Sequence, residues 1–448
     1  MKVAKFGGSS MATAAQLHKV ASIIKDDPSR KIIVVSAPGK RFADDVKTTD
    51  LLIQLGESYI NGEHYEEIYG KVLSRFREII EELLLNTALL EDIENTLKDV
   101  LSKDISSIAK LDALKSIGED SSAKILSAYL QAIGFEASYV NPKDAGIIVS
   151  NNPGNAQILD SSFTKIYALR EKVGILVIPG FFGYTEDGEL MTFSRGGSDI
   201  TGSIVAAGVE ATLYENFTDV DSVYAVNPTI VSNPKEIKTL TYKEMRELSY
   251  AGFSVFHDEA LIPAFKKQIP VCIKNTNNPH LPGTNIVAEK KPEEKCVVGI
   301  ASDTGFSSLY VSKYLMNREI GFGRKLLNIL EDEGISFEHA PSGIDDLSVI
   351  IRDSKLSKAK EKNITKRIYE ELHPDTVILH RDLAMIMVVG EGLMNTIGVA
   401  QKATTAIANA NVNIEMINQG SSEVSMMFGI QAADLNRAVE SLYHVFFD

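Results

Sequence analysis

The chain has very little cysteine and no long hydrophobic run. Its two cysteines, Cys272 and Cys296, are too few for a disulfide framework and do not have zinc-site spacing, which fits a reducing compartment. No apolar stretch approaches the length of a membrane span, and the N-terminus has no signal-peptide core. We therefore expect a cytoplasmic protein with no membrane partner.

Basic residues are also scarce, since 46 Lys and Arg face 60 Asp and Glu and the net charge is −14. No basic field would attract a phosphate backbone, which excludes nucleic acid as a main partner. The Walker phosphate loop is missing, and Gly321-Phe322-Gly323 and Gly390-Glu391-Gly392 lack the third glycine of a dinucleotide fingerprint. Any anionic ligand must be held by a few local cations.

The chain does contain short apolar strands that alternate with helices over its first 290 residues. Its 448 residues correspond to about three domains. The near-continuous apolar run at 31–35 is typical of a parallel sheet covered on both faces. We predict a three-layer αβα sandwich with a mainly parallel sheet, and almost wholly helical structure over 50–130. The expected strands are 2–6, 31–35, 137–140, 174–180, 211–216 and 270–274.

The loop at 193–203 contains Arg-Gly-Gly-Ser-Asp and precedes an apolar helix. A helix start offers free N–H groups and a positive dipole end to an anion. Arg195 suits two-bond contact with a carboxylate or phosphate, and Asp199 adds a carboxylate in the first turn. Taken alone, this loop is as well interpreted as a glycine turn with a surface arginine.

Two further charged residues lie beside such loops. Lys5 ends the first strand and faces Gly7-Gly8-Ser9-Ser10, although a solvated lysine is the simpler interpretation of the local pattern. Glu119 lies in Gly118–Ser122, which we expect to start a helix, so it can be a helix-start carboxylate and nothing more. Because ligands of such sheets bind beyond the carboxyl ends of the strands, we expect these loops to converge on one site.

An internal repeat follows a charged linker at 289–295. Gly321 matches Gly398 at an offset of 77, and Glu338 matches Glu415. Each copy reads strand, glycine loop, helix, strand, strand, helix, strand, which predicts two ferredoxin-like βαββαβ units. The expected domains are 1–290, 296–375 and 380–448.

Together these motifs resemble the aspartate kinases of the amino-acid kinase superfamily. The resemblance rests on Lys5–Ser10, on Ser194–Asp199, and on Thr218-Asp219 with Tyr224. The repeat is similar to the paired ACT domains that regulate these enzymes. The chain departs from the family at Asp221-Ser222, at 227–229 and at 252–258, where we interpret His257 as structural.

The resemblance implies transfer of the ATP γ-phosphoryl group, with Mg²⁺, to the β-carboxylate of L-aspartate. The product, aspartyl β-phosphate, begins the pathway to lysine, threonine and methionine. Phosphoryl transfer needs positioning and charge neutralisation, and a carboxylate of pKa about 4 is already ionised, so no general base is needed. Mg²⁺ would bridge the phosphates with few protein ligands, and no metal-binding residues are assigned.

The resemblance also implies roles for individual residues. Lys5 would contact the transferring phosphoryl group and Asp199 would organise the centre. The substrate contacts would be Arg195 to the α-carboxylate, Glu119 to the ammonium, and Thr49 and Ser198. The ATP contacts would be Lys5, Gly7, Gly8, Ser9, Thr218, Asp219, Tyr224, Lys274, Asn275 and Thr276.

For regulation we expect feedback inhibition by lysine, bound in the first ACT unit near the interface of a homodimer. Glu338, expected on the strand after the helix, could pair with the lysine ammonium. An exposed strand carboxylate is the alternative, and threonine, alone or with lysine, is the alternative effector. The expected allosteric residues are Met316, Glu319, Gly321, Phe322, Glu338 and Ser342.

Two other functions are compatible with parts of the pattern. One is another kinase of the same fold, acting on glutamate, carbamate or a nucleoside monophosphate. Arg195 with Glu119 and the tandem repeat favour an amino-acid substrate instead. The other is a non-catalytic ACT amino-acid sensor, which intact Lys5 and Asp199 argue against.

Overall fold

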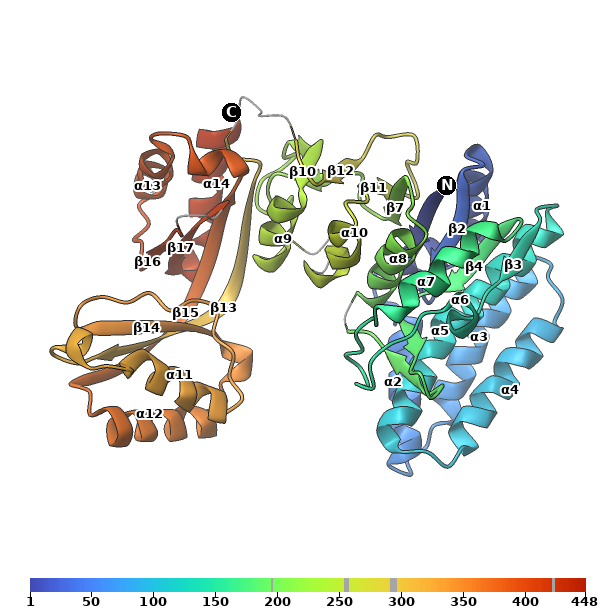
Figure 1. Ribbon diagram of the computed structural model, residues 1–448, viewed down its shortest axis with the longest axis horizontal. Coiled ribbons are helices and arrows are strands. Elements are labelled where there is room, and N and C mark those ends of the chain that lie inside the picture. The colour runs from blue at the N-terminus through green and yellow to red at the C-terminus, as the bar shows by residue number, and fades with distance from the viewer. Residues whose placement is uncertain (195, 254–257, 291–295, 421–423) are drawn as a thin grey trace. The chain divides into compact units, whose positions relative to one another are not determined.

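The computed structural model describes residues 1–194, 196–253, 258–290, 296–420 and 424–448. The chain divides into two compact units, which are described separately below (Figure 1). The first unit is Met1–Val223, Glu236–Arg246 and Ser254–Lys291, and the second is Tyr224–Lys235, Glu247–Phe253 and Pro292–Asp448. In the parts of the chain that the structure describes, no helix is both long and apolar enough to cross a bilayer.

The first unit is built on an eight-stranded sheet of order β10-β12-β11-β7-β1-β2-β4-β3. All six expected strands are present, and the prediction of a mainly parallel sheet is confirmed. Only the pairing of β11 with β12 is antiparallel within this sheet of the described residues. The strands are β1 (Lys2–Phe6), β2 (Arg30–Val35), β3 (Ala137–Tyr139), β4 (Ile175–Pro179), β7 (Leu213–Thr218), β10 (Thr239–Thr241), β11 (Val271–Asn275) and β12 (Thr284–Val287).

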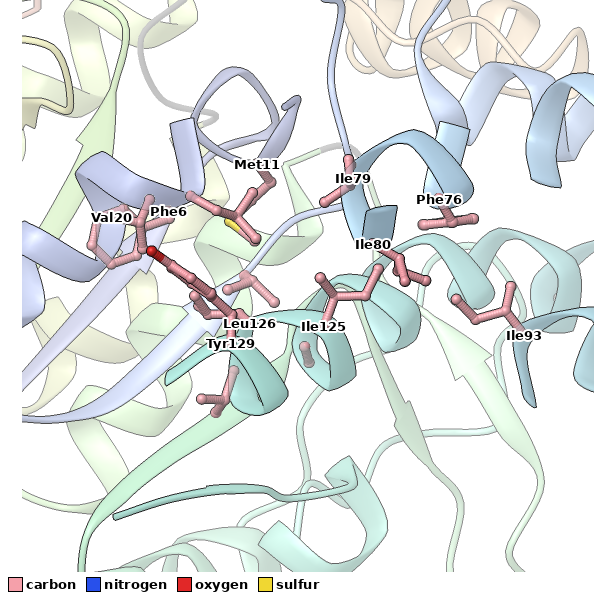
Figure 2. Close-up of a cluster of buried hydrophobic side chains, with 14 of the residues drawn as sticks. Phe6, Met11, Val20, Phe76, Ile79, Ile80, Ile93, Ile125, Leu126 and Tyr129 are labelled. Atoms are coloured by element: carbon pink, nitrogen blue, oxygen red, sulfur yellow. The ribbon is translucent and has the colours of Figure 1, made fainter. Parts of the chain in front are cut away.

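Five helices lie on one side of this sheet. They are α1 (Ala14–Asp26), α2 (Thr48–Ile60), α3 (Glu66–Glu82), α4 (Ala88–Ser102) and α5 (Ser107–Ala132). Of these, α5 packs directly on β2, β3 and β4, and α3 and α4 pack on other helices. Figure 2 shows how Phe6 of β1 shares a buried cluster with α1, with Phe76 and Ile80 of α3, with Ile93 of α4 and with Leu126 of α5. The helical 60–115 segment is therefore attached to the sheet through α5, by apolar burial.

The expected helix start at Gly118 is wrong, because α5 runs unbroken from Ser107 to Ala132. The helix begins instead after Ser106, whose side chain accepts a hydrogen bond from the Ala109 N–H. A Cβ at residue 118 would lie 2.6 Å from the Cβ of Ala37. Gly118 thus allows close packing of α5 on the loop after β2, and Glu119 lies in the middle of a helix.

The opposite face of the sheet carries α8 (Gly197–Gly208), which begins after Gly196 in a left-handed conformation, φ +78°. Residues alternate between the two faces of a strand, so Lys5 points away from the Phe6 cluster and toward α8. The shorter elements of the unit are α6 (Pro142–Ala145), β5 (Phe182–Tyr184), β6 (Leu190–Thr192), α7 (Ser161–Tyr167) and α10 (Ile262–Lys266).

The second unit contains an antiparallel five-stranded sheet of order β14-β13-β15-β17-β16. Its repeat is visible in two helices, α11 (Phe322–Asp332) and α13 (Val399–Asn409), whose bounds differ by 77 residues. Gly321 and Gly398 precede them with φ of +83° and +85°. The other elements are β13 (Gly299–Ser312), β14 (Asp346–Arg352), α12 (Lys358–Leu372), β15 (Thr376–Val389), β16 (Met416–Asn418), β17 (Ser425–Gln431) and α14 (Leu435–Phe447).

The two copies share their long strands, which corrects two details of the expected pattern. Among the described residues, the second copy's expected last strand is not formed after α14. Residues 299–304 of β13 take its place by pairing with 384–389 of β15. In the first copy, the strand expected at Glu338 is reduced to isolated bridges at His339–Ile350 and Ser342–Leu347. Both differences depend on how strands distant in the sequence pair with one another. The hydrophobic periodicity of the sequence does not predict that pairing.

Candidate active site

Three loops meet at the carboxyl ends of β1, β7 and β11. The Gly7 N–H donates to the Phe217 carbonyl at 3.0 Å, and the Thr276 N–H donates to the Thr218 carbonyl at 2.9 Å. The hydroxyl oxygens of Ser10 and Thr276 are 2.6 Å apart. The structure therefore brings the expected nucleotide loops together at one edge of the sheet.

A cavity of about 590 Å³ opens beside these loops. It is lined by residues from the glycine loop after β1, the loop after β2, the start of α2, the middle of α5, and the start of α8. Its lining includes seven of the residues expected from the sequence, namely Gly8, Ser9, Thr49, Glu119, Ser198, Asp199 and Asp219. Residues far apart in the chain thus form one concave site.

Lys5 and Asp199 form a buried ion pair in this region. The Lys5 Nζ lies 2.6 Å from the Asp199 Oδ1, with the two side chains only 8% and 17% exposed. Asn216 on β7 donates its amide N–H to the same oxygen, also at 2.6 Å. The sequence analysis missed Asn216, because its role depends on the register of β7 against β1.

Glu119 is the most perturbed acid of the site. It is 5% exposed, and burial raises the pKa of its carboxyl group to about 8, despite hydrogen bonds to the Ala37 backbone and the Ser198 side chain and despite the Lys5 charge. Its Oε2 is buried and has no hydrogen-bond partner among the residues that the structure describes. A buried acceptor of this kind is unfavourable until a donor arrives, and the ammonium group of a small ligand would supply one.

The loop after β2 is held in place by contacts that the sequence analysis did not identify. Gly39 approaches the glycine loop so closely that a Cβ there would lie 2.6 Å from the Gly8 carbonyl carbon. Buried Arg75 of α3 donates to the Gly39 and Val46 carbonyls, both at 3.0 Å, and to Asp45 at 2.9 Å. These contacts set the rim of the cavity, which also includes Lys40 and Lys47.

Not every expected residue joins this group. Arg195 and His257 lie outside the described residues, and Tyr224 falls in the second unit. Lys274 pairs in register with Phe217, so its side chain starts on the sheet face opposite Lys5. The departure at Asp221 has a structural role, because its Oδ1 accepts hydrogen bonds from Asn275 at 2.7 Å and Asn278 at 2.9 Å.

The expected effector loop lies before α11 in the second unit. Met316 and Phe322 are buried, and Glu319 lies 2.5 Å from Lys313 and 3.1 Å from Lys325, whose hydrogen bonds lower its pKa. The Asn317 N–H donates to the Ile344 carbonyl at 3.1 Å, which holds the loop to the turn before β14.

Glu338 and Ser342 lie at opposite ends of the β14 hairpin. Glu338 donates its N–H to Ile350, and its carboxylate contacts Tyr250 and the Arg352 Nε, the latter at 3.4 Å. Ser342, near the effector loop, lines a cavity of about 440 Å³ with Tyr310 and Glu415 among others. Glu338 is bonded at the Ile350 and Arg352 end of β14, whereas the 316–322 loop is held to Ile344, before the other end of that strand.

Comparison with known proteins identifies the family. The model of the amino acid kinase family matches residues 1–275, and an ACT domain model matches residues 386–446. Aspartokinase 3 of Bacillus subtilis is 56% identical over 448 residues, covering 100% of this chain and 99% of the relative. The chain belongs to the aspartokinases of the amino acid kinase family. It is therefore an ATP-dependent phosphotransferase that acts on a carboxyl group of aspartate.

Solved structures agree with this assignment. The crystal structure of Clostridium acetobutylicum aspartate kinase is 40% identical and has a TM-score of 0.88, with 100% of both chains covered. E. coli aspartokinase III in complex with aspartate and ADP has a TM-score of 0.78 at 24% identity, again over 100% of both chains, and supports the fold. The family resemblance inferred from the motifs is confirmed.

Proposed function

We propose that the cavity beyond β1, β2 and α8 is where this aspartokinase transfers the ATP γ-phosphoryl group to the β-carboxylate of L-aspartate. One observation carries the proposal. The same cavity is lined by the buried, incompletely bonded carboxyl group of Glu119 and by Asp199, the partner of Lys5. A site for an ammonium group thus adjoins a site for a negatively charged phosphoryl group.

The aspartate would bind through groups of opposite charge. Its ammonium would donate to Glu119, with Ser198 and Thr49 as further contacts, and Arg195 would hold the α-carboxylate. Aspartokinase III of E. coli has been solved with aspartate bound, which supports an aspartate site in a protein of this fold.

The nucleotide would bind across the joined loops at 7–9, 218–219 and 275–276, with Lys5 donating to the transferring group. Mg²⁺ would supply charge neutralisation on the phosphates. Among the described residues there is no group of three His, Cys, Asp or Glu side chains that could hold a metal, so we propose that the phosphates and water are its main ligands.

The role of Lys5 is tested by replacing it with methionine. Lys5→Met should lower kcat for aspartate by a few orders of magnitude, as expected when a preorganised charged donor is lost. Lys25→Met on the exposed surface of α1 is the matched control and should keep wild-type kcat. If Lys5→Met retains near-wild-type kcat and a wild-type melting temperature, Lys5 has no part in the transfer.

We further propose that the protein is cytoplasmic, that residues 1–290 form its catalytic domain, and that 296–375 and 380–448 are its two regulatory ACT units.

We propose that lysine is the feedback inhibitor. E. coli aspartokinase III has also been solved with lysine and aspartate, which supports this effector. Since Glu338 lies away from the 316–322 loop of its own chain, a lysine held by both would lie between two copies. Threonine is the alternative effector.

A further inference from the structure

Asn216 occupies an unusual position in the central sheet of the first unit. It is paired in register with Lys5 on the neighbouring strand β1, and with Ile273 on its other neighbour β11. All three side chains therefore leave the same face of the sheet. Asn216 is only 3% exposed. A buried amide in the middle of a parallel sheet is unfavourable unless its polar atoms are bonded, and asparagine is a poor strand residue.

The side-chain nitrogen of Asn216 bonds to Asp199 and to a second residue that itself holds Asp199. Its Nδ2 donates to the Asp199 Oδ1 at 2.6 Å and to the Tyr214 hydroxyl at 3.3 Å. Tyr214, fully buried, donates in turn to the Asp199 main-chain carbonyl at 3.2 Å. Burial holds the pKa of the Tyr214 hydroxyl well above its usual range, so this donor keeps its proton. Asp199 is thus held at both its backbone and its carboxylate by β7.

The carboxylate oxygen that Asn216 bonds is the one that also receives Lys5. If Lys5 turned toward a phosphoryl group, an oxygen with no second donor would be left buried and incompletely bonded. The neutral amide remains in place and fixes the orientation of Asp199 without adding charge. It therefore makes the release of Lys5 toward the substrate less unfavourable.

We propose that Asn216 is a positioning residue for phosphoryl transfer, holding the Asp199 carboxylate while Lys5 moves its N–H donors to the transferring group. This inference rests on the proposed roles of Lys5 and Asp199. Strand β7 would then do more than contact the nucleotide at its carboxyl end. Through Asn216 it would also hold Asp199 of the Lys5–Asp199 ion pair in place.

Two substitutions test this role. Asn216→Leu keeps similar volume and removes the donor, and kcat should fall roughly ten- to hundredfold, as for one lost hydrogen bond to a charged group, while the KM values for ATP and aspartate stay within about twofold. Asn216→Asp is nearly isosteric but puts a second carboxylate beside Asp199, which raises the pKa of the pair. The acid side of its kcat–pH profile should therefore move to higher pH.

Ile273→Val is the matched control, since it perturbs the same sheet face next to Asn216 without removing a partner of Asp199. Its kcat should equal that of wild type when rates are normalised to folded enzyme. Wild-type kcat in Asn216→Leu, or a wild-type acid limb in Asn216→Asp, would overturn the inference. Equal losses of kcat in Asn216→Leu and Ile273→Val would also overturn it. An active Lys5→Met would instead remove the proposed role of Lys5, on which this inference rests.

Discussion

Glu119 is the residue whose protonation should report substrate binding most directly. With a pKa raised to about 8 by burial, it is mostly neutral at pH 7 in the free enzyme. An aspartate ammonium favours the ionised form, so binding should release close to one proton. The apparent Kd for aspartate should fall roughly tenfold per pH unit as pH rises from 6, levelling near pH 8. Calorimetry in buffers of different ionisation enthalpy measures both quantities.

The raised pKa of Glu119 also predicts how the free energy of unfolding changes with pH. Its folded-state pKa is raised from 4.5 to about 8, so the native state binds more protons than the unfolded state across that range. Glu119 therefore makes stability fall as pH rises through this window, and Glu119→Gln should remove that fall. Proton release unchanged by Glu119→Gln would contradict the assignment of Glu119 to the ammonium site.

At the residue scale, the sequence predicted those site residues that local order places at strand ends. The apolar strand and the glycine loop that contain Lys5 and Gly7–Ser9 are present as predicted. The local pattern alone favoured a solvated Lys5, whereas its side chain is only 8% exposed. Asn216 could not be predicted, because its chemistry depends on the strand that lies beside β7. The raised pKa of the Glu119 carboxyl group could not be predicted either, because it arises from burial against loops distant in the sequence.

At the element scale, short apolar runs predicted six of the eight strands in the first unit's sheet, but not β10 or β12. Amphipathic stretches predicted the helical 50–130 segment. The errors fell where a glycine had a packing role, as at Gly118, or where a strand was completed by a distant segment, as with residues 299–304 of β13. Hydrophobic periodicity and residue propensity describe one helix or strand at a time. The continuous α5 at Gly118 and the completed sheet at β13 both depend on a second element packed against the first.

The hairpin at β14 carries a prediction for regulation. Lysine should inhibit the wild-type enzyme, and Glu338→Ala should raise the concentration needed roughly tenfold or more, as expected for a lost charge-assisted contact. Glu370→Ala, at an exposed position of α12, is the matched control and should respond as wild type does. Initial rates during separate titrations with lysine and threonine provide the measurement.

Two results would count against this arrangement. Lysine insensitivity of the wild type would end the effector proposal, and inhibition by threonine alone would replace lysine with the alternative. Unchanged lysine inhibition in Glu338→Ala would leave Glu338 with only its contacts to Arg352 and Tyr250. Inhibition itself requires that the effector bind a less active conformation more tightly than the active one.

At the scale of the whole molecule, a chain of net charge −14 has to bind a polyanionic nucleotide. General attraction cannot help, so local groups must bind the nucleotide. In our proposal these are the glycine-loop amides, Lys5 and the lysines at the cavity rim. These groups lie close together because the carboxyl ends of the parallel strands meet at one edge of the sheet. The second unit, with its shared sheet and two equivalent helices, is where we propose that an effector binds.

The central claim is that the cavity between the glycine loops and α8 phosphorylates aspartate. The most direct measurement is the rate of ADP release from ATP, in a coupled assay, over a panel containing L-aspartate, L-glutamate, carbamate and no acceptor. We predict rapid release with L-aspartate and background rates with the others, accompanied by an acyl phosphate that hydroxylamine traps. Preferred turnover of glutamate or carbamate, or no acceptor-dependent release at all, would contradict the account.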